Sequence, residues 1–530
     1  MHKKPQKRKD HQRLRADSGH HRRILAVMAL LGVLAFVPIA AQLVGLMVGA
    51  FDYYSRKALR NQTRTTTVTA DRGTIYDRNM NILACSKSVE NVYLDPHELK
   101  QSKADIPAIA EKLGQILDLN PKWIEKQAAD IKMRYKQVAA RISEETATQI
   151  RAYINESGIS GIHLEPNSQR YYPFGSLAAQ VIGFTNASNT GSEGVEAAYN
   201  SFLEGTAGKV ITTKGNNEMD MPFSYEKYVS SQKGDSLILT LDTTVQACLE
   251  KQMKAAIARY DVQNGAFGLV MNVNTGEILA MATLGNYDPN HYLEIADPQA
   301  LAETEELKKA YLSHPEGSEA YQNGLKAYQE AVQAARLKQW RNRVLSDGYE
   351  PGSTFKIFTS TACLEAGTVS LADSFFCPGY YTVEDRKIRC HKVGGHGSES
   401  FVEGVQNSCN PVFMNIGLEL GTDRFYEYFQ KIGLMKKTGV DLPGEAATIT
   451  HKKENVGPVE LATMTFGKSF QITPMQLASM VSSVVNGGTR VTPHFGVRVL
   501  NEDGEVLETL QFEKEKNVIS KETSETMRSI

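Results

Sequence analysis

The longest apolar run in the sequence lies near its start, from Ile24 to Ala50, and contains no charged residue. As a helix rising 1.5 Å per residue it would be roughly 40 Å long, which exceeds the hydrocarbon thickness of a bilayer, about 30 Å. The apolar part of a secretory signal peptide is only about 7 to 15 residues long, so cleavage is disfavoured. We therefore expect a transmembrane helix over residues 24–50 and, since no second run reaches this length, a single-pass membrane protein.

The charges around this run predict its orientation. Residues 1–23 contain nine Lys or Arg against Asp10 and Asp17, a net charge of +7 in a chain whose overall net charge is −1. Because positive residues favour the cytoplasmic side, we expect this basic tail in the cytoplasm and the chain beyond the helix outside the cell membrane. Beside a membrane span, the tail is better explained as a topology determinant that contacts anionic lipid than as a segment that binds nucleic acid.

Two domains are predicted beyond the anchor. From residue 60 to residue 233, short β-type runs mix with helical patterns over Asp105–Leu117 and Glu144–Asn155, without a repeat period. This mixture predicts an irregular α+β domain. The polar stretch Ser230–Gly234 then separates it from a second domain over residues 234–530.

The second domain begins with the pattern of a sheet flanked by helices. The predicted elements are a strand over Ser236–Leu241, a helix over Thr244–Tyr260, and a hairpin of Phe267–Val273 and Glu277–Ala282 around Asn274–Gly276. Residues 297–340 are rich in Ala, Glu, Lys and Gln, so we interpret them as a solvated helical insertion. Together these patterns predict a multi-domain α+β protein.

Composition narrows the class of protein further. The chain has 530 residues, several times the length of a typical domain, of which 41% are hydrophobic and 22% charged. These values exclude collagen-like, low-complexity and disordered classes. Six cysteines are too few for a fold built on disulfides.

Ser353 and Lys356 carry the first chemical signal. They place a hydroxyl and an amine three residues apart, on one face of a helix whose apolar run ends at Gly367. At the first turn of a buried helix, unpaired backbone N–H groups favour an oxyanion. A lysine removed from water can lose its proton near neutral pH and act as the base for a serine nucleophile. We predict these two roles for Lys356 and Ser353.

The Ser-x-x-Lys spacing alone is weak evidence, because the chain contains it three times. The other two tetrads, Ser224–Lys227 and Ser230–Lys233, lie in polar, loop-like sequence. Ser353 instead follows Glu350-Pro351-Gly352 and precedes an apolar helical pattern. Only this tetrad is predicted to be functional.

Ser408-Cys409-Asn410 is the second element. The following Pro411 disfavours helical dihedrals at Asn410 and suits the first position of a helix, so we expect Ser408 and Asn410 to project from a loop before a helix. A hydroxyl there could relay a proton, and a carboxamide could hold both the lysine and a substrate amide.

With these elements in this order behind an anchor, the chain resembles the class B penicillin-binding proteins, membrane-anchored D,D-transpeptidases that cross-link peptidoglycan. The resemblance extends from the anchor to the last residue, and Glu350–Lys356 with Asn407–Pro411 look closest to the septal and sporulation-specific division branch, the elongation branch being the alternative. Further motifs that carry the resemblance are Arg72-Gly-Thr-Ile-Tyr-Asp-Arg78, Arg170-Tyr-Tyr-Pro173 with Gly183-Phe184, Glu193-Gly-Val-Glu196, Leu241-Asp242 with Gln246, and Thr473-Pro-Met-Gln-Leu-Ala478.

The family implies a pedestal domain followed by a transpeptidase domain with an antiparallel sheet flanked by helices. It implies that Ser353 attacks the D-Ala-D-Ala carbonyl of a stem peptide and forms an acyl-enzyme, with Lys356 as base and Ser408 and Asn410 completing the site. β-Lactams would acylate Ser353. A wall-synthesis glycosyltransferase and division proteins are the implied partners, and no metal or organic cofactor takes part.

One family motif is not found where the family places it. No Lys-Ser/Thr-Gly, the third motif on a strand beside the nucleophile, follows the Thr473–Ala478 segment, and we reject Gly467-Lys468-Ser469-Phe470 as its equivalent because Phe470 replaces the glycine. The sequence stops within a predicted helix over Lys521–Ile530. We therefore expect a transpeptidase domain lacking its C-terminal part, and a chain that is inactive or weakly active by itself.

Other classes of protein share some of these features. A β-lactamase or membrane-bound β-lactam sensor would use the same Ser353 and Lys356, but the first needs no pedestal and the second should carry more spans and a His-Glu-x-x-His motif. A non-catalytic scaffold of a wall-synthesis complex is the alternative from a different class.

Four potential metal ligands lie close in sequence: Cys377, Cys390, His391 and His396. They could bind zinc. Outside the cell, a Cys377–Cys390 disulfide is favoured over zinc, and closing so short a loop would contribute about 3 kcal/mol. The third possibility is that Cys377 and Cys390 are free thiols. Cys409 has no activating histidine nearby in sequence, so we do not interpret it as a nucleophile.

Overall fold

The computed structural model describes residues 18–51, 53, 63–131, 135–213 and 227–530. The chain divides into two compact units: residues 1–67 with 209–230, and residues 68–208 with 231–530. The basic tail before residue 18 lies outside the described residues, as does Ser224 of the first non-functional tetrad.

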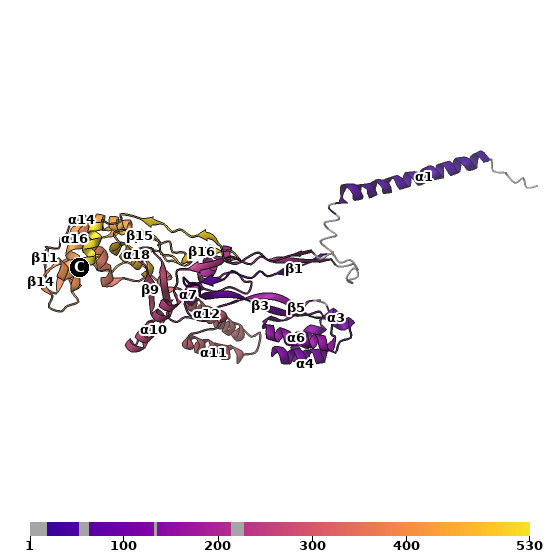
Figure 1. Ribbon diagram of the computed structural model, residues 1–530, viewed down its shortest axis with the longest axis horizontal. Coiled ribbons are helices and arrows are strands. Elements are labelled where there is room, and N and C mark those ends of the chain that lie inside the picture. Colours follow the sequence, from indigo (N-terminus) through magenta and orange to yellow (C-terminus); the bar gives the residue numbers. More distant parts are fainter. Residues whose placement is uncertain (1–17, 52, 54–62, 132–134, 214–226) are drawn as a thin grey trace, which may run out of the picture. The chain divides into compact units, whose positions relative to one another are not determined.

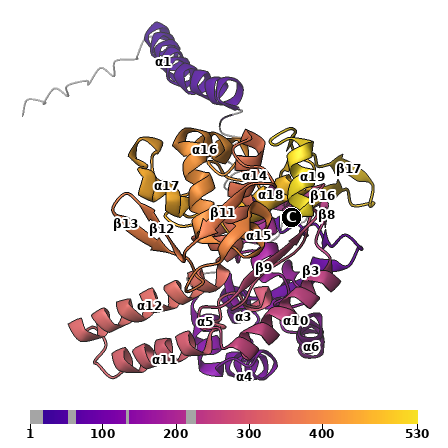
Figure 2. The ribbon, with the colours of Figure 1, turned by 90° about the vertical axis from the view of Figure 1, so that its left-hand side faces the viewer.

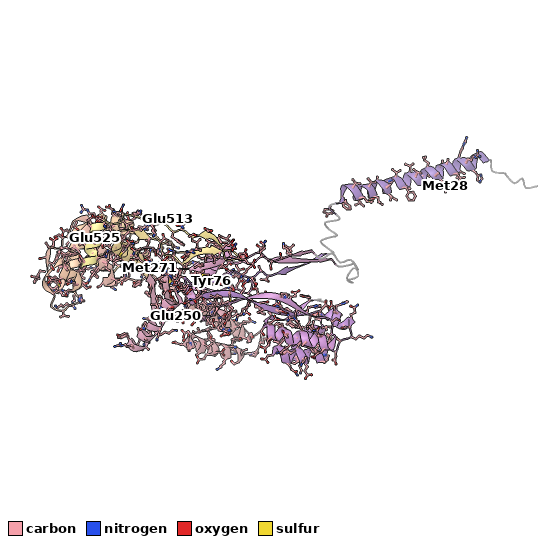
Figure 3. The ribbon with its side chains drawn as sticks, viewed as in Figure 1. Met28, Tyr76, Glu250, Met271, Glu513 and Glu525 are labelled. Atoms are coloured by element: carbon pink, nitrogen blue, oxygen red, sulfur yellow. The ribbon has the colours of Figure 1, made fainter. Side chains whose placement is uncertain are left out.

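The first unit contains the predicted anchor helix. Helix α1 spans Ser18–Val44 and continues as a π-helical turn over Gly45–Gly49. Over His21–Gly49 it is long and apolar enough to cross a membrane, and its side chains, such as Met28 in Figure 3, are exposed. The same unit holds most of a three-stranded sheet in the order β1-β6-β7, formed by Thr63–Val68, Gly208–Thr213 and Lys227–Val229.

The second unit begins with the α+β region predicted for the pedestal. Its long strand β3, Ile82–Leu94, pairs with β4, Lys136–Ile142, and β5, Ile162–Tyr171. Figure 1 shows β3 and β5 side by side, with α4 and α6 packed next to them. The helices are α3 Pro96–Gln101, α4 Ile106–Leu117, α5 Pro121–Ala129 and α6 Glu144–Ser157, so both helices predicted here are confirmed.

One sheet continues from this region into the following one. Strand β2, Ile75–Tyr76, pairs with β3 on one side and runs parallel to β8, Ser236–Leu239, on the other. Beyond β8 come β16, Gly496–Leu500, and β17, Val506–Thr509, which completes a seven-stranded sheet. Strands from both sides of the predicted domain boundary at residue 234 therefore belong to one hydrogen-bonded sheet.

The Arg72–Arg78 motif lies at the domain junction, where β2 pairs with both β3 and β8. Gly73 packs so closely that a Cβ would lie 1.8 Å from Asp235 O. Asp77, fully buried, accepts hydrogen bonds from the backbone N–H and the Oγ1 of Thr243. Burial opposes ionisation of Asp77, but hydrogen bonds from Asn81 and Thr243 outweigh it and lower its pKa. The motif therefore braces the strands before and after residue 234 against each other.

Short helices and a helical hairpin fill the region around the junction. They are α7 Ala179–Ile182, α8 Gly194–Ala198, α9 Asn200–Leu203, α10 Thr243–Tyr260, α11 Pro298–Leu312, α12 Glu319–Trp340 and α13 Arg343–Ser346. Figure 2 shows α11 and α12 side by side, which confirms the helical reading of residues 297–340. The predicted hairpin forms β9, Phe267–Met271, and β10, Ile278–Thr283.

A mainly helical part with its own core completes the unit. Its helices are α14 Lys356–Ala366, α15 Phe401–Gln406, α16 Asn410–Lys431, α17 Pro458–Met464, α18 Pro474–Val485 and α19 Lys521–Ser529. Two small hairpin pairs flank them, β11 Ser374–Cys377 with β14 Gly397–Ser400, and β12 Tyr380–Val383 with β13 Arg386–Arg389. A further pair is β15 Arg490–Val491 with β18 Lys514–Glu515. Stacked and edge-on rings, Phe355, Phe358, Phe425 and Phe429, form the centre of the core.

Candidate active site

Ser353 lies in a short 3₁₀ turn, Gly352–Phe355, that leads directly into α14. The helix ends where the sequence predicted, because Gly367 takes the left-handed conformation with φ of 68°. Ser353 itself is exposed, whereas Lys356 is only 4% exposed. The hydroxyl therefore faces solvent at the start of a buried helix, in a 3₁₀ turn rather than in the first α-helical turn that we expected.

The residues before Ser353 are anchored to the segment that we rejected as a third motif. Gly352 N donates to Gly467 O at 3.0 Å, and a Cβ on Gly467 would lie 2.2 Å from Gly352 O. Glu350 pairs with Lys468 at 2.8 Å and accepts from the backbone N–H of Ser469 at 2.9 Å. This segment thus positions the turn that carries Ser353.

Lys356 is buried against the Ser408–Asn410 loop. Its Nζ donates to Ser408 O at 2.7 Å, to Ser408 Oγ at 3.0 Å and to Asn410 Oδ1 at 2.7 Å. The ring of Phe413 lies 5.1 Å from Nζ. All three hydrogen-bond partners are uncharged, so within the described part of the chain no carboxylate pairs with the ammonium.

Burial lowers the pKa of Lys356 from 10.5 to about 8, opposed in part by the nearby thiols of Cys390 and Cys409. The cause is loss of water around the charged form. A substantial fraction of the amine is therefore neutral slightly above pH 7. Of its three partners, only Ser408 Oγ carries a hydrogen that it can donate back to a neutral amine.

The Ser408–Asn410 loop is held by its backbone. Helix α15 begins with a capping box between Ser400 and Glu403. After its end, Ser408 takes a left-handed conformation with φ of 52°, and its N–H donates to Val405 O. Helix α16 begins at Asn410 itself, so the prediction that Asn410 precedes the helix was wrong by one residue; Pro411 occupies an early helical position where no N–H is needed.

The structure thus brings Lys356, Ser408 and Asn410 together by direct hydrogen bonds and places Ser353 one turn before Lys356. No hydrogen bond joins the Ser353 hydroxyl to Lys356 among the described residues. Glu350, Lys468 and Ser469 are positioning groups that sequence reasoning missed. Their only signal was the nearness of Glu350 to the motif, since the partner segment is more than a hundred residues away.

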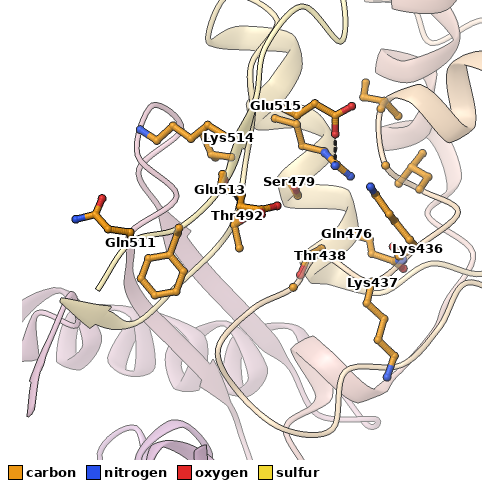
Figure 4. Close-up of a pocket in the computed structure, with 17 residues that line it drawn as sticks. Lys436, Lys437, Thr438, Gln476, Ser479, Thr492, Gln511, Glu513, Lys514 and Glu515 are labelled. Atoms are coloured by element: carbon orange, nitrogen blue, oxygen red, sulfur yellow. Dashed lines mark hydrogen bonds and ion pairs between the residues drawn. The ribbon is translucent and has the colours of Figure 1, made fainter. Parts of the chain in front are cut away.

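A large cavity of about 740 Å³ is lined by other residues. It lies between the loop after α16, helix α18 and the strand β18, with Lys436, Lys437, Thr438 and Gln476 around it (Figure 4). An ion pair joins Arg490 to Glu515 at its wall. None of the four predicted site residues lines this cavity, so its size does not mark the candidate site.

All six cysteines lie within the described residues, and all are free thiols. The disulfide expected between Cys377 and Cys390 is therefore not formed in this structure. Their Sγ atoms instead lie in a group with His396 and Cys409. His391, which the sequence grouped with them, is exposed.

Comparison with known proteins assigns both regions of the second unit. Residues 266–530 match the penicillin binding protein transpeptidase domain, and residues 67–239 match the penicillin-binding protein dimerisation domain. The chain is 32% identical over 511 residues to stage V sporulation protein D of Bacillus subtilis strain 168, covering 96% of this chain and 72% of that protein. The chain belongs to the class B penicillin-binding proteins.

A second relative lies in the same class of penicillin-binding proteins. Peptidoglycan D,D-transpeptidase FtsI of Escherichia coli strain K12 is 28% identical over 470 residues, which cover 88% of this chain and 69% of that protein. Among solved structures, penicillin binding protein 2X from Streptococcus thermophilus superposes with a TM-score of 0.66 at 22% identity, covering 88% of this chain and 66% of that one. At this identity the structural match shows the fold alone.

Within this penicillin-binding protein, the predicted fold is confirmed: an N-terminal apolar helix, a dimerisation domain and a mixed α+β transpeptidase domain. The family motifs around Arg72, Arg170 and Glu196 form a buried ion network. Arg72 Nε lies 2.5 Å from Glu196 Oε2, and Arg170 Nε lies 2.6 Å from Oε1 of the same carboxylate. These ion pairs connect the three motifs inside the second unit.

Proposed function

We propose that this penicillin-binding protein is a membrane-anchored D,D-transpeptidase that cross-links peptidoglycan stem peptides in septal or sporulation wall synthesis. The observation that carries this proposal is the buried, carboxylate-free Lys356 beside Ser408 and Asn410, one turn from an exposed serine. The similarity to a sporulation protein and to a D,D-transpeptidase supports the reaction and the division branch.

In the first half of the reaction, Ser353 Oγ attacks the carbonyl carbon of the penultimate D-Ala. The hydroxyl proton passes to neutral Lys356, and the backbone N–H groups at the start of α14 face the developing oxyanion. The C–N bond to the terminal D-Ala then breaks, and its nitrogen takes a proton from Lys356 through Ser408 Oγ. An ester on Ser353 and free D-Ala result.

In the second half, an amine from another stem peptide attacks the ester. Lys356 accepts the amine's proton, the ester C–O bond breaks, and Ser353 recovers its hydrogen. Asn410 holds Lys356 through Oδ1, while its Nδ2 lies within 3.4 Å of Arg389 O. A β-lactam would follow the first half alone, because its amide opens without leaving the site.

Covalent labelling with a fluorescent penicillin tests the proposal. In the full-length protein, Ser353→Ala should abolish labelling, and peptide mapping should find the adduct on Ser353. Ser230→Ala is the matched control, since Ser230 begins a Ser-x-x-Lys tetrad outside the site and is exposed. Undiminished labelling of Ser353→Ala would refute the assignment. Rapid release of the adduct would indicate a β-lactamase instead.

The same labelling measures the activity of the 530-residue chain. We propose that it is acylated slowly, because no Lys-Ser/Thr-Gly follows α18 to recognise the substrate carboxylate, and Lys437-Thr438-Gly439 lies before that helix and outside any strand. Strong Ser353-dependent labelling of this chain would contradict the proposal. Complementation by a full-length Ser353→Ala variant present at normal abundance would favour the scaffold alternative.

We further propose that the N-terminus is cytoplasmic and that the second unit lies outside the membrane. The basic tail before α1 supports this orientation. Cys248 is exposed and distant in sequence from the site, so a membrane-impermeant maleimide should label it in intact cells or spheroplasts. Cys248→Ser is the control. Labelling that requires permeabilised membranes would reverse the orientation.

A further inference from the structure

Four metal-ligating side chains lie together next to the loop that holds Lys356: Cys377, Cys390, His396 and Cys409. One ligand atom from each lies within 4.8 Å of every other. Three cysteines and one histidine are a donor set of structural zinc sites. The reaction proposed above uses none of the four, so their convergence has no catalytic explanation.

Backbone pairing brings the first three ligands together. Strand β11 pairs with β14 so that Cys377 faces Gly397, and His396 immediately precedes that glycine. Cys390 follows β13, and its N–H donates to Gly379 O at 2.9 Å, two residues beyond Cys377. The chain approaches itself so closely here that a Cβ on Gly395 would lie 2.1 Å from Cys377 O.

Cys409, the fourth ligand, lies on a different element of the fold. It is the N-cap residue of α16 and lies between Ser408 and Asn410. The sequence had grouped His391 with the other three, because it is close along the chain. The structure replaces exposed His391 with fully buried Cys409, which completes a compact set of four.

The four side chains are shielded from water. Cys377, Cys390 and Cys409 are 1%, 8% and 0% exposed, and the His396 side chain is 5% exposed. Beside them, Glu399 has a side chain 2% exposed whose Oε1 has no hydrogen-bond partner among the described residues. This oxygen lies 3.9 Å from His396 Nδ1, the nitrogen that also lies next to Cys390 Sγ, so Glu399 places a buried carboxylate beside the candidate metal position.

The spacing suits tetrahedral zinc. With Zn–S bonds of about 2.3 Å, neighbouring ligand atoms lie about 3.8 Å apart. Cys390 Sγ and His396 Nδ1 are already 3.7 Å apart, and the limit of 4.8 Å for the whole set requires shifts of about 1 Å at most. Four protein ligands leave no position for water or substrate, which is typical of a structural site.

We propose that, in the reduced chain, Cys377, Cys390, His396 and Cys409 bind one zinc ion, which fixes Cys409 and thereby positions Ser408 and Asn410 on either side of it. The ion would tie the start of α16 to β11, β13 and β14. A Cys377–Cys390 disulfide would remove two of the four ligands, so disulfide and zinc exclude each other. The proposal concerns binding and does not depend on the transpeptidase reaction.

The test is a titration of the reduced, metal-free 530-residue chain in detergent with Zn²⁺ alone, against a chromophoric chelator. We expect about one tightly bound zinc per chain, and a tetrahedral cobalt spectrum with thiolate charge-transfer bands when Co²⁺ replaces zinc. Cys409→Ala and His396→Ala should each lose tight binding. His391→Ala and Cys248→Ala are matched controls and should keep it.

The cobalt spectrum uses the parent chain and keeps the test valid even where a ligand variant fails to fold. A folded, reduced parent chain that binds no zinc overturns the proposal, as does an octahedral cobalt spectrum without thiolate bands. Tight binding that survives in Cys409→Ala or is lost in His391→Ala overturns the ligand assignment. A disulfide found in the isolated protein, with no zinc uptake after reduction, also overturns it.

The carboxylate provides a finer test. Glu399→Gln should weaken zinc binding several-fold, because a neutral amide replaces the buried carboxylate beside the dication. Glu403→Gln is the control, since Glu403 only caps the exposed start of α15. Equal affinities for the two variants would remove Glu399 from the site.

Discussion

Two buried clusters in the second unit differ in the partners that surround their positively charged side chains. At the domain junction, the guanidinium groups of Arg72 and Arg170 share the carboxylate of Glu196, with side chains 0–2% exposed. At the candidate site, Lys356 is 4% exposed and its Nζ donates to neutral oxygens of Ser408 and Asn410. The first cluster pairs its cations with a carboxylate, and the hydrogen-bond partners of Lys356 among the described residues include none.

The difference separates a structural from a reactive group. Arginine stays protonated and its planar fork fits a carboxylate, so the junction is permanently charged and rigid. Lysine loses its proton when it is desolvated without a counter-charge, so Lys356 can exchange protons near neutral pH. Burial alone therefore does not identify a functional charge; the partner does.

The largest expected effect comes from Lys356→Met. Methionine keeps the length of the side chain but removes the base, so the acylation rate of full-length protein by penicillin should fall about 100-fold to 10,000-fold. Stopped-flow or gel-based labelling measures it. A rate within threefold of the parent would mean that Lys356 is buried for structural reasons alone.

The junction should respond in stability instead. Glu196→Gln leaves Arg72 and Arg170 buried without their counter-charge, and we expect a loss of about 3–5 kcal/mol in the free energy of unfolding. Chemical denaturation followed by circular dichroism measures it. Glu111→Gln, at an exposed carboxylate of α4 outside the ion network, should change it by less than about 0.5 kcal/mol. Similar losses for both variants would show that the ion network contributes no more to the free energy of unfolding than an exposed carboxylate does.

The pH dependence of acylation provides the third comparison. The neutral amine is the active form, and deprotonation occurs as pH rises through the lowered pKa of about 8. The rate should therefore rise nearly tenfold from pH 6 to pH 7 and level off above pH 8. A rate that is flat from pH 6 to pH 9 would remove the neutral lysine from the mechanism.

The smallest effect is expected at an exposed pair. Lys468→Met removes the ion pair with Glu350, whose two side chains are 52% and 39% exposed. Solvent screens such pairs, so we expect a loss of less than about 1 kcal/mol in stability and an acylation rate within a few-fold of the parent. A hundredfold slower rate would show that the Glu350–Lys468 ion pair affects acylation at Ser353 as strongly as Lys356 does.

Local patterns were sufficient for most elements and for proposing the candidate site residues. The helices predicted over Asp105–Leu117 and Glu144–Asn155 form, and their caps, Asp105 and Ser143, need only the following turn. Likewise, Gly367 ends α14 as expected. The Ser353 tetrad was chosen over Ser230 from its flanking residues, which also describe local structure.

Contacts between residues far apart in the chain could not be predicted from the sequence. Nothing near Cys409 indicated that α16 would start against β11 and β14, so it was left out of the cysteine group and His391 was included instead. The anchoring of Glu350 by Lys468 and Ser469 spans more than a hundred residues. Strand pairing across position 234 was missed for the same reason, because β2 is only two residues long.

The continuous sheet has a mechanical consequence. Strands β4, β3, β2, β8 and β16 are joined in one ladder, and Arg72, Gly73 and Asp77 close the narrowest point at β2. A flexible joint between these strands would have to break backbone hydrogen bonds and expose the buried arginines. A force applied to β4 or β5 would therefore be carried toward β16 through the backbone hydrogen bonds of β2.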